Sequence, residues 1–166
     1  MQGSRDMLKL GIVVAVSDYT HQKKLPACTR DGAAMAEVLR LSGRFDDILQ
    51  IDQETKSTRV KQRLASFIDS YNDSSIEEVI FYFTGHGEFT NNQFYYLFTD
   101  YEQRRLRQTA LENSELDDII RTVNPSLFVK IVDACHSGMT YIKGPEELRA
   151  CVKSTNVGFN KLYFMF

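Results

Sequence analysis

Five apolar runs along the chain have the composition of buried strands. Each is rich in β-branched or aromatic residues, which is typical of strands covered on both faces in a parallel sheet. The runs span residues 8–17, 46–51, 78–83, 127–132 and 162–166. Asn91-Asn92 is a turn signal, so residues 94–98 after it are expected to form a small hairpin arm.

Three segments between these runs have the three- and four-residue apolar spacing of amphipathic helices. Residues 31–41 form the first, the hydroxyl of Thr58 caps the start of the second, and residues 114–123 form the third, which Asn124-Pro125 ends. The first apolar stripe is Ala34, Val38 and Leu41, and the second is Val60, Leu64, Phe67, Ile68 and Tyr71.

Strands that alternate with helices predict an α/β fold, here a three-layer sandwich with a mainly parallel central sheet flanked by helices. The 166 residues fit one domain. Residues 138–160 are the one long stretch without clear periodicity. Because a loop of that length in a compact domain is usually functional or mobile, we expect a mobile active-site or processing loop there.

Composition and charge narrow the choice of partners and compartment. A formal net charge of -2 gives no reason to expect a nucleic acid or an anionic membrane as partner. No apolar run approaches the roughly 20 residues that cross a bilayer. The three cysteines, Cys28, Cys135 and Cys151, are odd in number and widely spaced, which suggests a reducing compartment. We therefore expect a cytoplasmic protein.

Two predicted strands run into reactive residues. One leads to Thr84-Gly85-His86-Gly87-Glu88, the other to Asp133-Ala134-Cys135-His136-Ser137-Gly138. Sites in open α/β sheets form outside the carboxyl ends of strands, and a catalytic thiol needs a nearby imidazole. The flanking small residues would let a substrate backbone approach. A lone His and a lone Cys are more often core residues, but these glycine-flanked strand ends favour a catalytic pair of His86 and Cys135.

The alternation of side chains along a strand adds a binding pocket to this pair. Residues i and i+2 share a face, so Thr84 lies on the side of His86, and Asp133 on the side of Cys135. A carboxylate beside the nucleophile suggests a pocket for a cation. The alternative is that Asp133 is a buried acid satisfied by backbone donors.

These motifs resemble those of caspase-like cysteine peptidases, specifically the large-subunit region of the metacaspase and orthocaspase branch. The resemblance covers nearly the whole chain and includes Ser17-Asp18-Tyr19 and the segment 25–31 as well as the two motifs above. In caspases the His precedes the Cys by about 50 residues, and here 135 minus 86 gives 49. Asp133 stands where caspases have Gln, which points away from true caspases and their acidic cleavage sites.

The resemblance implies a cysteine endopeptidase that cleaves proteins or peptides after Arg or Lys. It places Asp31 and Asp133 in the pocket for the residue before the scissile bond, with Cys28 and Thr84 at its other positions. Two carboxylates suit a guanidinium independently of the resemblance. Arg30 leaves an alternative open, because an arginine in this pocket would select acidic (Asp) substrates.

The implied mechanism is acyl transfer. The Cys135 thiolate attacks the peptide carbonyl, His86 protonates the leaving amine, and water hydrolyses the acyl-enzyme. The resemblance assigns the oxyanion hole to the backbone N–H groups of Gly87 and Cys135. His136 is a weaker candidate base, because adjacent residues of an extended segment point to opposite sides.

No metal or other cofactor is expected. Many metacaspases need calcium, and their matching segment carries an acidic pair where this chain has Asn113-Ser114. Residues 139–143 contain no acid, and Asp117-Asp118 is out of register and has the pattern of a solvated helix face. Since calcium sites depend on the number of charged oxygen ligands, this site is expected to be lost.

Two alternatives and one further expectation complete the sequence-based picture. The chain could be a non-catalytic caspase-like scaffold, or Cys135, His136 and His86 could bind a metal, although their spacing is not that of a structural zinc site. The fold is expected to be incomplete at its C-terminal end, because the chain stops inside an apolar run. The resemblance implies a small-subunit segment or a second chain that completes the sheet. Candidate self-cleavage sites are Lys143, Arg149 and Lys153.

Overall fold

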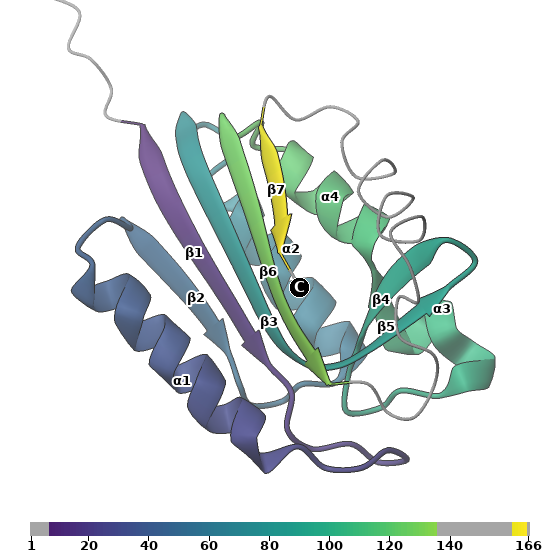
Figure 1. Ribbon diagram of the computed structural model, residues 1–166. Coiled ribbons are helices and arrows are strands. Elements are labelled where there is room, and N and C mark those ends of the chain that lie inside the picture. Colours follow the sequence, from purple (N-terminus) through teal and green to yellow (C-terminus); the bar gives the residue numbers. More distant parts are fainter. Residues whose placement is uncertain (1–6, 136–160, 166) are drawn as a thin grey trace, which may run out of the picture.

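The computed structural model describes residues 7–135 and 161–165 of the chain. Within them, seven strands form one sheet in the order β2-β1-β3-β4-β5, with β6 beside β3 and β7 beside β6 (Figure 1). The strands are β1 (Leu8–Ala15), β2 (Asp47–Ile51), β3 (Ile76–Thr90), β4 (Gln93–Leu97), β5 (Ala110–Glu112), β6 (Leu127–Cys135) and β7 (Leu162–Met165). All pairs among β2, β1, β3, β6 and β7 are parallel, and only β4 and β5 pair antiparallel. The predicted α/β fold with a mainly parallel sheet is confirmed.

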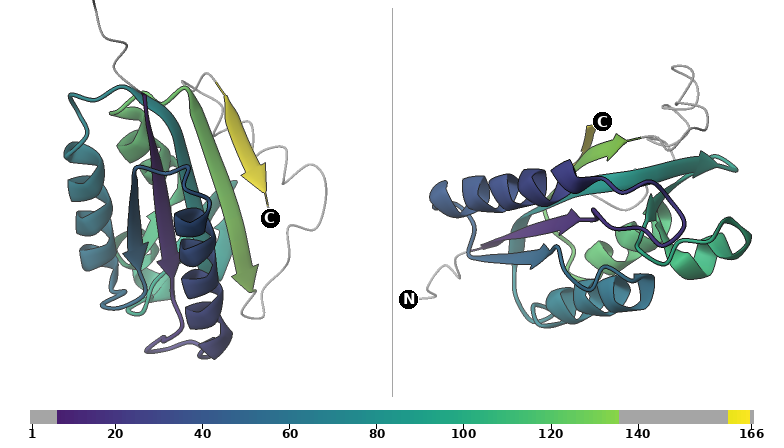
Figure 2. Two further views of the ribbon diagram at one scale, coloured as in Figure 1. Left: turned by 90° about the vertical axis from the view of Figure 1, so that its left-hand side faces the viewer. Right: turned by 90° about the horizontal axis from the view of Figure 1, so that it is seen from below.

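Helices lie against both faces of the sheet. The helices are α1 (Pro26–Leu41), α2 (Ser57–Asp69), α3 (Leu106–Thr109) and α4 (Asn113–Arg121), and η1 (Gln103–Arg105) is a short 3-10 turn. Helix α1 covers one face, and α2 lies on the other face with α4 beside it (Figure 2). Alternate residues of β1 point to opposite faces of the sheet. Val13 packs with α1, whereas Ile12 and Val14 belong to the larger core that includes α2 and α4.

The buried stripe of α1 differs from the predicted one. Val38 and Leu41 are 60% and 78% exposed, whereas the buried residues are Cys28, Gly32, Ala36 and Leu39. A Cβ at Gly32 would lie 2.4 Å from the Cβ of Ala15, so the helix backbone packs directly on β1. Close packing of small residues, rather than the largest apolar side chains, decides which face is buried. The helix also starts at Pro26, a favoured first position, and therefore carries Asp31 within it.

The predicted hydroxyl cap of α2 is wrong. Helix α2 begins at Ser57, one residue before Thr58, and has no capping side chain of its own. Instead, the Asp100 carboxylate accepts hydrogen bonds from the Ser57 backbone N–H at 2.7 Å and from its hydroxyl at 2.8 Å. A carboxylate from a distant loop thus satisfies this helix start, which no local pattern could indicate.

Strands β3 and β6 run further than predicted. The apolar pattern ends at Phe83 and Val132, but β3 continues to Thr90 and β6 to Cys135. Residues Asn91 and Asn92 then adopt positive φ angles of 50° and 61°, and β4 returns antiparallel, which confirms the predicted hairpin arm. In Figure 1 the far end of β3 bends away from the main sheet to form this arm. His86 therefore lies inside a strand and not beyond its end.

Candidate active site

The backbone register brings the two predicted catalytic residues next to each other. Strands β3 and β6 are parallel neighbours, and their aligned positions include Thr84 with Asp133 and His86 with Cys135. For Cys135, the structure describes the backbone. Two segments that are 49 positions apart in the sequence thus meet at one end of the sheet, as the strand-end argument predicted.

His86 is held on several sides by its surroundings. The residue is only 2% exposed. Its Nε2 atom lies 2.7 Å from the carbonyl oxygen of Lys23, and its backbone N–H donates to the Tyr19 hydroxyl at 2.7 Å. The Tyr19 ring packs against the imidazole with centroids 4.5 Å apart. Because a carbonyl oxygen can only accept, Nε2 carries a proton, and in the neutral ring Nδ1 is then the basic nitrogen.

The glycines on either side of His86 make room for aromatic rings of the protein. A Cβ on Gly85 would meet the Tyr19 hydroxyl at 2.7 Å, and a Cβ on Gly87 would meet the Phe94 ring at 2.4 Å. The sequence had suggested that these glycines allow a substrate backbone to approach. The Cβ sides of both residues are instead filled from within, so the glycines are required by the packing that holds His86.

The negative charges of two carboxylates act on the phenol of Tyr82, which precedes His86 by four residues on the same face of β3. The Tyr82 hydroxyl lies 3.4 Å from Oδ2 of Asp133, a long hydrogen bond. Burial, followed by the negative charge of Asp133 and a smaller effect of Asp31, raises the pKa of Tyr82 to about 12. Asp31 on α1 and Asp133 on β6 therefore both disfavour ionisation of the same phenol, which stays protonated at neutral pH.

The four predicted pocket residues differ in accessibility. Asp31 and Asp133 are exposed, and neither forms an ion pair with a residue that the structure describes. Thr84 and Cys28 are 1% and 3% exposed. Arg30 is exposed and is not among the charges that act on Tyr82. The interpretation of Asp133 as a buried acid is therefore wrong.

The segment considered for calcium is part of a buried polar cluster on the opposite face of the sheet. We call Asn113, Asp117 and Lys130 the lysine cluster. The Lys130 ammonium forms an ion pair with Asp117 and donates to Oδ1 of Asn113 at 2.9 Å, and the Tyr96 hydroxyl donates to the same oxygen at 2.9 Å. Burial raises the pKa of Asp117 to about 6. Asp117 is therefore not on a solvated helix face as predicted, whereas Asp118 is exposed.

Residues 7–135 and 161–165 contain no group of three or more His, Cys, Asp or Glu side chains arranged to hold a metal ion. None of the helices in this part of the chain is both long and apolar enough to cross a membrane. His136, the 138–160 loop and the self-cleavage candidates Lys143, Arg149 and Lys153 lie outside the described residues.

Sequence reasoning missed three residues that contact the candidate pair and its pocket: Tyr19, Lys23 and Tyr82. Tyr82 could have been found, because it shares the i, i+2 alternation of Thr84 and His86. Tyr19 belongs to a motif that was noticed, but its hydroxyl contact depends on the path of the chain after β1. Lys23 contributes only a backbone carbonyl, which leaves no signal in the sequence.

Comparisons with known proteins place the chain in a family. Among solved structures, the chain is similar to protein GSU0716 from Geobacter sulfurreducens, with 12% sequence identity and a TM-score of 0.52. The match covers 80% of this chain and 52% of that protein, so the chain spans about half of its length, and the likeness concerns the fold alone. No curated protein matches the sequence significantly. The caspase-domain profile of peptidase family C14 matches residues 8–158. The chain therefore belongs to the caspase-domain family of cysteine peptidases.

Proposed function

We propose that this chain is the catalytic, large-subunit portion of a cysteine endopeptidase that cleaves protein substrates after Arg or Lys. The observation that carries the proposal is the register of β3 and β6, which aligns His86 with Cys135 while the Lys23 carbonyl fixes the ring of His86. The motifs favour the metacaspase and orthocaspase branch. A three-layer sandwich completed by a small-subunit segment or a second chain fits this assignment.

His86 would act first as base and then as acid. Nδ1 accepts the proton of the Cys135 thiol, and the thiolate sulfur attacks the carbonyl carbon of the scissile bond. The imidazolium then gives its proton to the leaving amine as the C–N bond breaks, which leaves a thioester. Water loses a proton to His86 and attacks the thioester, and the thiolate departs with the carboxylic acid product released. The Lys23 carbonyl stabilises the imidazolium through its hydrogen bond from Nε2.

The backbone supports the assignment of Gly87 to the oxyanion hole. The Thr84 carbonyl accepts from Val16 after β1, and the His86 N–H donates to Tyr19, which also follows β1. Because backbone groups alternate between the two edges of a strand, the Gly87 N–H is directed to the other edge, where β6 ends at Cys135. Together with the Cys135 N–H, it would hold the oxygen that becomes negative.

Basic specificity is supported by the two unpaired acids. Asp31 and Asp133 act on the same phenol and have no cation of the described chain beside them, so a guanidinium or ammonium group would gain two carboxylate partners there. The buried Thr84 and Cys28 would form the floor of this pocket. Acidic specificity read by Arg30 is less favoured, since its charge is not among those that act on Tyr82.

The direct test is labelling with a peptidyl-arginine chloromethylketone. A peptidase with basic specificity is alkylated at Cys135, and peptide mapping by mass spectrometry locates the adduct. His86→Ala should suppress the reaction, and a peptidyl-aspartate reagent should react much more slowly. A caspase-like scaffold without activity would give no adduct at Cys135 with either reagent, and preference for the aspartate reagent would make Arg30 the specificity residue.

Activation by self-cleavage belongs to the same proposal. A peptidase that cuts after basic residues has Lys143, Arg149 and Lys153 available in its 138–160 loop. Incubation of the purified protein followed by intact-mass analysis should reveal a cut after one of them, and Cys135→Ala should remain whole. The enzyme is proposed to act in the cytoplasm and to need no metal for activity.

A further inference from the structure

A polar groove lies beside the hairpin arm. It is separate from the proposed substrate pocket of Asp31 and Asp133, which we call the acid pocket. The volume of the groove is about 490 Å³, and its walls come from the β3–β4 turn, β4, β5 and the segment of η1 and α3. Three of its lining residues are arginines, Arg104, Arg105 and Arg107, and only one is an acid, Glu112. We call it the arginine groove. Its charge is opposite in sign to the net charge of the whole chain.

The three arginines are not neutralised by the part of the chain that the structure describes. None forms an ion pair with a described carboxylate, whereas Arg40, Arg44, Arg59 and Arg121 all do. Within the described residues, the Arg105 guanidinium donates only to the side-chain oxygen of Gln108, at 2.9 Å. All three are exposed. Arg107 interacts in addition with the Tyr95 hydroxyl. Since each guanidinium has five N–H donors, most of them are still left for a ligand.

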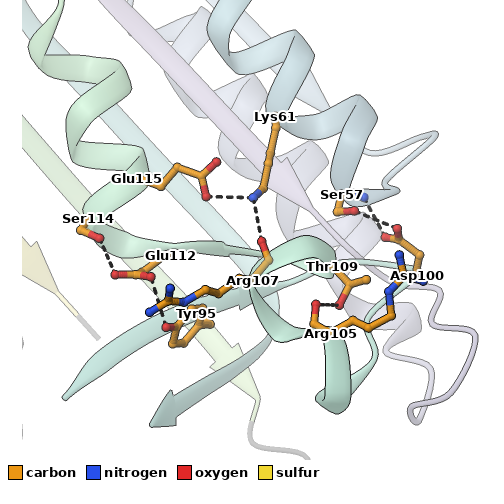
Figure 3. Close-up of polar contacts among 10 residues, drawn as sticks. All are labelled: Ser57, Lys61, Tyr95, Asp100, Arg105, Arg107, Thr109, Glu112, Ser114 and Glu115. Carbon is orange, nitrogen blue, oxygen red and sulfur yellow. Dashed lines mark hydrogen bonds and ion pairs between the residues drawn. The ribbon is translucent and has the colours of Figure 1, made fainter. Parts of the chain in front are cut away.

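The single acid of the groove is already engaged. Glu112 accepts hydrogen bonds from the Tyr95 hydroxyl at 3.2 Å and from the Ser114 hydroxyl at 2.6 Å. In Figure 3 the Arg107 side chain lies beside Tyr95 and Glu112, whereas Arg105 points the other way, so the charges are spread along the groove. Such a spread suits an extended anionic ligand better than a single small anion.

We propose that the arginine groove binds an acidic segment of a protein, such as a run of Asp and Glu residues. Guanidinium groups pair with carboxylates through two parallel hydrogen bonds. The other lining residues include the amides of Asn91, Gln93, Gln103 and Gln108, which can both donate to and accept from a peptide backbone. The groove thus offers partners for the side chains and for the main chain of the same segment.

A nucleic acid fits the groove less well. Single-stranded nucleic acids are held by basic grooves that also offer aromatic rings for base stacking. The one aromatic residue of this groove, Tyr95, is 3% exposed and presents no ring face. A membrane surface fits less well too, because the lining is mainly polar and contains one apolar residue, Leu106.

The groove is connected to the candidate active site through the hairpin. Tyr95 of the groove is the register partner of Glu88, two positions after His86. An acidic segment bound here would be tethered close to the catalytic end of the sheet. The binding itself does not depend on the proposed peptidase activity, so it can be measured without turnover.

The experiment uses fluorescence anisotropy with a fluorescein-labelled octaglutamate peptide and the full chain carrying Cys135→Ser. We expect saturable binding that weakens steeply with added salt. The triple variant Arg104→Gln, Arg105→Gln, Arg107→Gln should bind about tenfold more weakly or worse. The matched control Arg40→Gln, Lys56→Gln, Arg59→Gln removes the same number of exposed positive charges and should stay within about twofold of the parent.

Each remaining arm supports or overturns the proposal. Labelled octaglutamine should not bind, and inorganic phosphate should not displace octaglutamate at equal charge concentration. Displacement by oligothymidylate at a lower concentration than by unlabelled octaglutamate would assign the groove to nucleic acid, and displacement by phosphate would assign it to phosphate groups. Equal losses in the triple variant and the control would show nonspecific attraction. If the triple variant unfolds, Arg104→Gln decides. The Arg104 side chain makes no hydrogen bond or ion pair with the residues that the structure describes, so its substitution should not affect folding but should weaken binding about threefold.

Discussion

Strand β6 carries two charged residues three positions apart that the fold treats in opposite ways. Lys130 points to the face of α2 and α4, is fully buried, and is matched by Asp117 and Asn113. Asp133 is exposed at the other face beside the phenol of Tyr82, whose pKa Asp31 also raises, and no cation that the structure describes forms an ion pair with it. One charge is paired with neighbouring side chains, and the other has no oppositely charged partner among the residues that the structure describes.

The contrast distinguishes charged residues that stabilise the fold from charged residues that are available to bind a ligand. A buried ammonium is tolerated only when its partners are built into the fold, and removing one of them leaves an uncompensated charge. Two like charges kept together without a cation destabilise the folded protein slightly and are useful only when a ligand brings the opposite charge. The first arrangement should therefore respond to mutation through stability, and the second through activity.

The largest effect is expected at the catalytic pair. Cys135→Ala and His86→Ala should each lower kcat/KM for peptide hydrolysis by about 10³-fold or more, because base and nucleophile act as a unit. His86→Ala should also lower the free energy of unfolding by about 1–3 kcal/mol, since the ring is buried and hydrogen-bonded to Lys23. Steady-state kinetics and urea denaturation measure the two quantities. Substantial turnover by purified Cys135→Ala would refute the assignment.

Disruption of the lysine cluster should come next. Lys130→Met leaves the buried Asp117 without its cation and should lower the free energy of unfolding by about 3–5 kcal/mol. Adding Asp117→Leu to that variant removes the stranded charge and should restore part of the loss. Asp118→Asn, one position away but exposed, is the matched control and should change stability by less than about 0.5 kcal/mol. Equal losses of stability in Lys130→Met and Asp118→Asn would contradict the assignment of Asp117 as the buried partner of Lys130.

Neutralising the acid pocket should change activity but not stability. Asp133→Asn should lower kcat/KM for arginine substrates by about 10- to 100-fold and leave the free energy of unfolding within about 0.5 kcal/mol, because the side chain is exposed. The same change should lower the pKa of Tyr82 from about 12, as measured by ultraviolet titration of the phenol. Arg30→Gln is the control and should have little effect on arginine substrates. A preference for aspartate substrates that disappears in Arg30→Gln would reverse the specificity.

The pH dependence of stability should report on Asp117. Its pKa is raised to about 6 in the folded protein from 3.8, so between these values the folded state binds more protons than the unfolded state. This residue therefore lowers the free energy of unfolding as pH rises from about 4 to about 6, by about 1–3 kcal/mol in all. Asp117→Asn should lose that step, and Asp118→Asn should retain it. Identical pH profiles for Asp117→Asn and the parent would contradict the raised pKa.

The smallest effect is expected from metal removal. The side-chain oxygen of Asn113 already accepts hydrogen bonds from Lys130 and Tyr96. A calcium ion at this position would be repelled by the Lys130 ammonium, whereas calcium sites need several negatively charged oxygen ligands. EGTA should therefore change kcat/KM by less than about twofold. Complete loss that added calcium reverses would show that acids elsewhere in the chain bind the ion.

The sequence by itself determined the class of fold and the pairing of the two motifs. Uninterrupted β-branched runs can only be buried on both faces, so the parallel sheet followed from composition. Parallel neighbours end at one edge, so the motifs around His86 and Cys135 had to meet if their strands were adjacent. The alternation rule likewise put Thr84 and Asp133 beside them. All of these inferences rest on the pattern of apolar and polar residues along each strand, which can be seen in the sequence itself.

The tertiary structure decided everything that depends on contacts between distant segments. The buried stripe of α1 followed from the approach of Gly32 to Ala15, and the start of α2 from Asp100. Asp117 and Asp118 are adjacent residues of the same type. Only the direction in which α4 packs on the sheet makes Asp117, and not Asp118, the partner of Lys130. The orientation of His86 depends on a backbone carbonyl at Lys23, and a carbonyl is the same in every residue. Periodicity fixes which face a side chain lies on, but its partner is fixed only when another part of the chain packs there.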